Sequence, residues 1–286
     1  MQSPDKATSG THFILYFFSL VLAIGAVGYT PWVLASYNLF PSSLSSIFLI
    51  VGGLSPTLAA IVVASIEYGK TGPRYLFGQF GRRGFSKSWF LVPIAIPFVL
   101  SICAVLLWSG FGGVYNLDMS GLVGFPLILI ANFLMNMLEE IGWRGYALPT
   151  LQRRYSALAS SLMIGVFWTL WHWPHFAVKD SLMANTFHNF FWFAVFTLLI
   201  SVSYSWLYNS TKGSLLTVSL YHSSINTVNT FLFINSSISY SVFPFYLLVT
   251  AMLTFAIVLI FKPDSLSNSK KVTTKQLIEA YQKIKA

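Results

Sequence analysis

The sequence has few charged residues, only 9% of the chain, and only eight of them are acidic. A soluble domain carries about 25% charged residues, so the composition excludes a water-soluble globular protein. Hydrophobic residues instead make up 55% of the chain, and they gather in long uncharged runs. The sequence therefore predicts an all-α, polytopic membrane protein.

Cysteine is almost absent as well. Cys103 is the single cysteine and lies in an apolar run, which excludes a disulfide framework and a cysteine-based metal cluster. The formal net charge of +9 does not indicate a nucleic-acid partner, because the basic residues are spread over the loops and the C-terminal tail. No internal repeat is present either.

The long apolar runs are the main feature of the chain. A bilayer-spanning helix needs about 20 apolar residues. Eight runs meet this requirement, and they cover residues 13–34, 46–66, 89–108, 122–147, 157–177, 186–208, 214–233 and 242–261. The first run is too long for the core of a signal peptide and no processing site stands out, so we expect it to be a retained span.

The connecting segments alternate in charge. Basic residues cluster in 67–88, in the turn with Arg153 and Arg154, and in the tail. The loops on the other side of the membrane hold a single basic residue, Lys179. The positive-inside rule then places both termini and the basic loops in the cytoplasm, in the cell membrane if the source is prokaryotic. The basic loop and the tail are expected to lie on anionic lipid.

Two adjacent carboxylates end the uncharged run 122–138. Placing the charged side chains of Glu139 and Glu140 in a membrane is unfavourable, because each charge at the bilayer centre costs roughly 2.5–3.5 kcal/mol of free energy. Glu140 and Arg144 are four residues apart, share a helical face and can form an ion pair. Glu139 lies about 100° round the helix from Glu140, so its partner must come from another segment.

Candidate partners occur in the later spans. An antiparallel hairpin of the fourth and fifth spans places His172 at a depth similar to that of Glu139. His222 and Asn226 are four residues apart and project from one face. His222 would lie nearer the membrane surface than Glu139 and His172 unless the fourth span breaks before the turn that follows it, and Pro149 makes such a break plausible.

The chemistry of these side chains points to hydrolysis. Glu139 and His172, converging on one water molecule, can deprotonate it for attack on a carbonyl. His222 and Asn226 are natural hydrogen-bond donors to the developing oxyanion. This set outlines a hydrolase that acts on a peptide bond inside or beside the membrane, within a cavity formed by the fourth, fifth and seventh spans.

Three motifs carry a family resemblance. Glu-Glu-x-x-x-Arg begins at Glu139, aromatic-x-x-x-His ends at His172, and His-x-x-x-Asn begins at His222. In this order they resemble the CAAX prenyl endopeptidase and bacteriocin-processing (CPBP, Abi) family of intramembrane proteases, over about Leu122 to Phe233. One departure is visible, because the family usually has phenylalanine where this chain has Trp168.

The resemblance implies a role for each motif residue. Glu139 would be the general base, working with His172, while His222 and Asn226 would hold the oxyanion. Glu140 and Arg144 would order the site. The substrate would be a lipidated or hydrophobic peptide, prenylated in eukaryotic members, and no metal or other cofactor is needed.

The resemblance also divides the chain into three parts. We expect three N-terminal spans with a basic interfacial loop in 1–121, the catalytic membrane core in 122–261 and a basic cytoplasmic tail in 262–286.

Three alternatives accompany this interpretation. A non-catalytic membrane scaffold or bacteriocin-immunity protein would have no reason to keep all four polar residues. A zinc protease would need three ligands, which Glu139, His172 and His222 could supply; His175 is a weaker candidate because Trp173 and Pro174 indicate a helix end. A proton-coupled transporter would be expected to show repeat symmetry.

Overall fold

The predicted all-α class is confirmed. The computed structural model describes residues 6–114, 123–231 and 239–285, and this part of the chain contains helices and no strand. The expected start of the fourth span at residue 122 and the expected end of the seventh at residue 233 lie outside the described residues, as do parts of the two loops that follow the third and seventh spans.

Within the described residues, six helical stretches are long and apolar enough to cross a membrane. They belong to α1 (Lys6–Ser36), α2 (Ser42–Tyr68), α4 (Val92–Gly110), the stretch Phe125–Leu151 that begins with α5 (Phe125–Glu140), α10 (Phe190–Ser210) and α12 (Ser239–Ser265). Each coincides with one of the eight predicted spans.

The predicted fifth and seventh spans are shorter. Their main helices are α7 (Ala157–Trp171) and α11 (Leu215–Asn229), with 15 residues each, and in the fifth span the short helix α8 (Trp173–Ala177) follows after His172. A helix of this length rises about 22 Å, less than the roughly 30 Å of the hydrocarbon core. The total of eight spans therefore stays a prediction. His172 directly follows α7, and His222 lies within α11.

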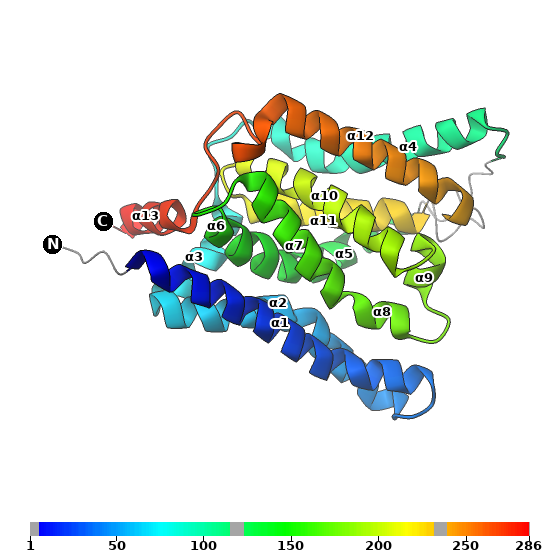
Figure 1. The fold of residues 1–286 in the computed structure, drawn as a ribbon, viewed down its shortest axis with the longest axis horizontal. Helices are drawn as coiled ribbons and strands as arrows, with labels where there is room; N and C mark the ends of the chain where they lie inside the picture. Colours follow the sequence, from blue (N-terminus) through cyan, green and yellow to red (C-terminus); the bar gives the residue numbers. More distant parts are fainter. Residues whose placement is uncertain (1–5, 115–122, 232–238, 286) are drawn as a thin grey trace.

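The helices form a bundle with two flanking pairs (Figure 1). α1 packs on α2 at one side and α4 packs on α12 at the other, while α5 pairs with α11 and α7 with α10 between them. Small residues permit close contact in the first pair: a Cβ on Gly28 would lie 2.3 Å from the backbone nitrogen of Gly52. Such close approach stabilises helix pairs in lipid, where dispersion contacts replace the hydrophobic effect.

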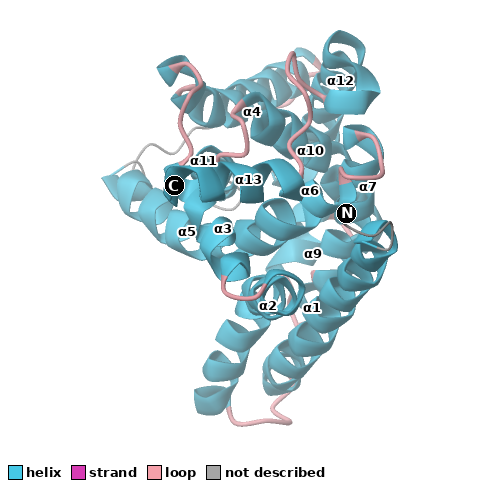
Figure 2. Cartoon of the chain, turned by 90° about the vertical axis from the view of Figure 1, so that its left-hand side faces the viewer, coloured by secondary structure: helices cyan, strands magenta, loops and turns pink. Residues whose placement is uncertain are grey.

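Both described ends of the chain and the basic turns lie at one end of the bundle, which faces the viewer in Figure 2. The helices α3 (Thr71–Gly78), α6 (Leu148–Leu151) and the C-terminal α13 (Thr274–Lys285) lie there, together with the 3-10 helices η1 (Gln79–Gly81) and η2 (Lys87–Phe90). This clustering agrees with the alternation of charge along the sequence. That this end faces the cytoplasm remains a prediction.

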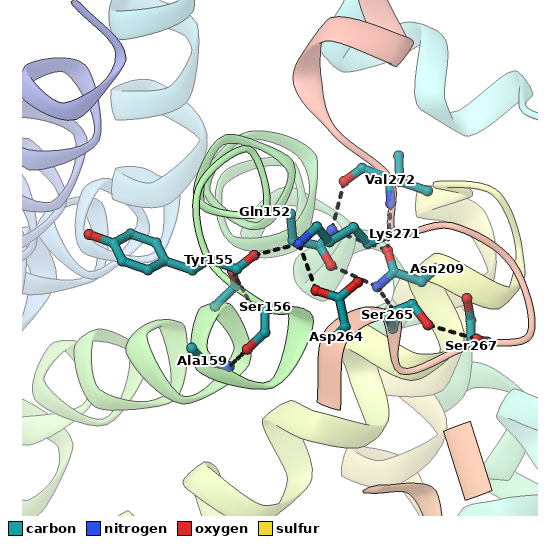
Figure 3. Close-up of polar contacts among 11 residues, drawn as sticks. Gln152, Tyr155, Ser156, Ala159, Asn209, Asp264, Ser265, Ser267, Lys271 and Val272 are labelled. Carbon is teal, nitrogen blue, oxygen red and sulfur yellow. Dashed lines mark hydrogen bonds and ion pairs between the residues drawn. The ribbon is translucent and has the colours of Figure 1, made fainter. Parts of the chain in front are cut away.

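The basic tail folds back onto the bundle (Figure 3). Gln152 Nε2 donates to the carbonyl of Val272 at 2.7 Å and to Asn209 Oδ1 at 3.1 Å. Asn209 Nδ2 donates in turn to Gln152 Oε1 at 2.7 Å and to the carbonyl of Ser265 at 2.8 Å. The two buried amides thus join the tail to the ends of α6 and α10, and Leu277 of α13 is buried as well.

Candidate active site

The two adjacent glutamates lie where α5 changes its helical register. α5 ends at Glu140 and continues as the π-helix η4 (Ile141–Ala147). π-helical turns occur frequently at functional sites. A Cβ on Gly142 would lie 2.5 Å from the carbonyl oxygen of Pro56, so glycine at this position lets α2 pack directly against the turn. The Thr57 hydroxyl also donates to the carbonyl of Leu138, so α2 fixes the backbone on both sides of the glutamates.

Glu140 is the buried centre of a charged cluster. Arg144 Nη1 donates to its two carboxylate oxygens at 3.0 and 3.2 Å, and both side chains are fully buried. The predicted ion pair is therefore present. His222 Nδ1 also lies 2.9 Å from Glu140 Oε1, a contact that the sequence did not indicate.

Arg144 is held between two aromatic rings. Its guanidinium carbon lies 4.7 Å from the ring centroid of Trp168 and 4.1 Å from that of Tyr204. Its Nε and Nη2 atoms have no hydrogen-bond partner among the described residues. A buried cation is costly unless it is paired, so this charge depends on Glu140 and on the two ring faces.

Where the structure describes the chain, Glu139 forms no ion pair with Arg144 or His222, the charged partners of Glu140. Its Oε2 accepts a hydrogen bond from Trp168 Nε1 at 3.3 Å. Within the described part of the chain it makes no direct hydrogen bond to His172 or His222, so the expected carboxylate–imidazole contact is not a direct one. One carboxylate oxygen of Glu139 remains available to a water molecule or a substrate.

His172 follows the last residue of α7 and has a defined tautomer. Its Nδ1 lies 2.8 Å from the carbonyl oxygen of Trp168, four residues earlier. Because a carbonyl oxygen only accepts, Nδ1 must carry the hydrogen, and Nε2 is the acceptor of the neutral ring. The aromatic-x-x-x-His spacing thus sets which nitrogen of His172 can accept a proton.

The four predicted catalytic residues line one cavity. Glu139, His172, His222 and Asn226 all contribute to its wall, and its volume is about 260 Å³. The predicted fourth, fifth and seventh spans supply these four side chains. The sequence missed the contribution of α10 and the short helix α9 (Leu182–Phe187), which provide most of the apolar wall: Met183, Phe187, Phe193, Phe196 and Ile200.

A polar seam between α5 and α11 orients Asn226. Its Nδ2 donates to Asn136 Oδ1 at 3.3 Å, and Asn132 Nδ2 donates to Thr227 Oγ1 at 2.9 Å. Asn132, Asn136 and Glu140 are spaced four residues apart and so form one stripe along α5. Sequence reasoning missed the two asparagines, although a four-residue polar spacing inside an apolar run was the signal that could have found them.

The described residues do not assemble a metal site. No three His, Cys, Asp or Glu side chains in the described ranges are grouped closely enough to hold an ion, and this includes Glu139, His172 and His222. His175 lines the same cavity, but its ring packs against those of Tyr29 and Trp32, with centroids 4.8 and 4.9 Å away.

Comparison with known proteins gives two matches. A family model described as type II CAAX prenyl endopeptidase Rce1-like matches residues 121–228. A protein named CAAX prenyl protease 2 from Methanococcus maripaludis is 29% identical over 226 residues, which cover 74% of this chain and 82% of the relative. These matches confirm the resemblance carried by the three motifs. With the six long apolar helices, they indicate a multi-pass integral membrane protein.

Proposed function

We propose that this protein is an intramembrane endopeptidase, because residues 121–228 match a family model described as type II CAAX prenyl endopeptidase Rce1-like. It hydrolyses a peptide bond in a lipidated or hydrophobic substrate. The observation that carries this proposal is the convergence of Glu139, His172, His222 and Asn226 on one cavity with otherwise largely apolar walls. A few convergent polar groups in an apolar pocket are typical of a site that binds and orients a small segment.

Water activation is assigned to Glu139 and His172. Trp168 holds one carboxylate oxygen of Glu139, and the other accepts a hydrogen bond from the attacking water. His172 Nε2 is the second acceptor, because its Nδ1 is bound to a backbone carbonyl. The water transfers a proton to Glu139 as its oxygen attacks the carbonyl carbon of the scissile bond.

The oxyanion is assigned to His222 and Asn226. The amide of Asn226 has a second N–H beyond the one bound to Asn136. Because the Glu140 carboxylate only accepts, Nδ1 of His222 carries the hydrogen in this contact, and the ring donates to the oxyanion through Nε2 when that nitrogen is protonated as well. Donors placed in advance around the developing charge lower the barrier without reorganisation. When the intermediate collapses, Glu139 returns its proton to the leaving nitrogen.

The dimensions and chemistry of the cavity favour a membrane-borne peptide. A volume of about 260 Å³ accommodates a short segment around the scissile bond, whereas sites for drug-sized molecules span about 300–1,000 Å³. The phenylalanine-rich wall from α9 and α10 matches an apolar side chain or lipid group. The basic end of the bundle would face the cytoplasm, in the cell membrane of a prokaryotic source, and the α9 wall of the cavity lies toward the opposite end of the bundle (Figure 1).

The direct test is cleavage by the purified protein in detergent. A farnesylated CAAX peptide, its non-prenylated counterpart and a panel of membrane peptides serve as substrates, with products identified by mass spectrometry. Glu139→Gln and His172→Ala should abolish turnover without loss of folding. Asp264→Asn is the matched control, because it removes a carboxylate that is 80% exposed at the chain's basic end. Undiminished cleavage by the first two variants would refute the mechanism.

The same assay separates the alternatives. A folded wild-type protein that cleaves none of the substrates would favour the scaffold or immunity role. The proposed mechanism needs no metal, so a chelator should leave turnover unchanged. Complete inactivation that zinc reverses would favour the metalloprotease alternative instead.

A further inference from the structure

Trp168 donates a hydrogen bond that phenylalanine, the usual residue at this position in the family that the chain resembles, could not donate. Its Nε1 donates to Glu139 Oε2 at 3.3 Å, and the side chain is 5% exposed. Phenylalanine has no hydrogen-bond donor in its ring. The indole therefore gives this chain a direct link between α7 and the carboxylate assigned as the general base.

The same residue also orients the histidine. The backbone carbonyl of Trp168 accepts the Nδ1 hydrogen of His172, with 2.8 Å between the heavy atoms. One residue thus holds Glu139 through its side chain and His172 through its backbone. Any rotation of α7 at this point would move both members of the pair that activates water.

Packing leaves the indole little freedom to turn. Arg144 covers one face, with its guanidinium carbon 4.7 Å from the ring centroid. The rings of His222 and Tyr204 meet it edge-on, with centroids at 5.3 and 5.5 Å. A side chain held on several sides presents its N–H in one direction, which is what a positioning group requires.

We propose, on the basis of the proposed function, that Trp168 is a positioning residue for Glu139. Its indole N–H fixes one carboxylate oxygen and so directs the other toward the water molecule. Removing the donor frees the carboxylate to rotate among several orientations, only some of which can accept the water proton. The loss falls on the chemical step and leaves substrate binding unchanged.

The test uses two tryptophan-to-phenylalanine variants on the same helix. Trp168→Phe removes the donor to Glu139 and keeps an aromatic face for Arg144. Trp171→Phe is the matched control, because Trp171 is also buried but donates to Ser55 Oγ at 2.8 Å. We expect kcat to fall on the order of tenfold in Trp168→Phe with KM unchanged, and to stay within about twofold of wild type in Trp171→Phe.

A second measurement does not depend on turnover. Indole N–H resonances of the ¹⁵N-labelled protein are assigned by their loss in Trp168→Phe and Trp171→Phe. Glu139→Gln should shift the Trp168 resonance, because its acceptor changes from a carboxylate to an amide, and should leave the Trp171 resonance in place. A Trp168 resonance that does not respond to Glu139→Gln would overturn the proposal even if no cleaved substrate is found.

The kinetic outcomes separate this inference from the function on which it rests. Wild-type kcat in Trp168→Phe, combined with an inactive Glu139→Gln, would refute the positioning role and leave the protease standing. A rise in KM alone would also refute it, because the ring would then act only as part of the cavity wall. Full activity in both Glu139→Gln and Trp168→Phe would instead refute the role of Glu139 as the general base, and a folded wild type that cleaves none of the substrates would refute the proposed function.

Discussion

Glu139 and Glu140 are neighbours in the sequence, yet replacing each of them with glutamine should affect a different property of the protein. Glu140→Gln removes the carboxylate that pairs with Arg144 at 3.0 Å, and both of these side chains are fully buried. Glu139→Gln removes a carboxylate that accepts one hydrogen bond at 3.3 Å and borders a cavity. The first variant should lose stability, and the second should lose activity.

The magnitudes follow from what each change leaves behind. Glu140→Gln leaves Arg144 as a buried charge without its counter-ion, and two of its nitrogens already lack a hydrogen-bond partner among the described residues. Breaking such a pair from one side costs about 3–5 kcal/mol. Glu139→Gln keeps an amide oxygen that can accept from Trp168, so the weakening of this one long hydrogen bond costs at most about 1 kcal/mol. At roughly 2–4 °C per kcal/mol for a chain of this size, Glu140→Gln should lower Tm by about 6–20 °C.

Thermal unfolding in one detergent, followed by tryptophan fluorescence, measures both variants. Turnover is measured at a temperature well below the lower Tm. A double variant, Glu140→Gln with Arg144→Met, should recover part of the lost stability because no unpaired charge remains. Equal Tm values for Glu139→Gln and Glu140→Gln would refute the argument, and so would a double variant no more stable than Glu140→Gln alone.

Three further predictions test the contacts around the site. Gly142→Ala should destabilise the fold or prevent its formation, because the new methyl group would overlap the Pro56 carbonyl. Gly53→Ala is the control: nothing lies within 4 Å of its Cβ position, so its Tm in the same unfolding assay should be unchanged or higher. Gln152→Leu should release the C-terminal tail, because the carbonyl of Val272 loses its buried donor. Limited proteolysis of the chain after α12 should then be faster than in wild type, and an unchanged rate would contradict the docking of the tail. Incubation with a chelator should change neither turnover nor Tm, and a fall in either that zinc reverses would contradict the metal-free mechanism.

Some features of this chain are local, and the sequence was sufficient to predict them. Long uncharged runs determine helices in a membrane, because unpaired backbone groups are too costly in lipid. Six of the eight predicted spans coincide with long apolar helices. The Glu140–Arg144 ion pair follows from four-residue spacing on a single helix, and the order of the three motifs was sufficient for the family resemblance.

The pairing of side chains between helices was decided only by the tertiary structure. Helical spacing fixes which residues share a face, but it leaves open how far one helix is shifted or rotated against its neighbour. The packing of neighbouring helices brings His222 to Glu140 and Trp168 to Glu139, and the π-helical turn that begins after Glu140 is not evident from the motif spacing. The apolar wall from α10 and the docking of the tail by Gln152 and Asn209 likewise join segments far apart in the chain, and no local pattern encodes their distance.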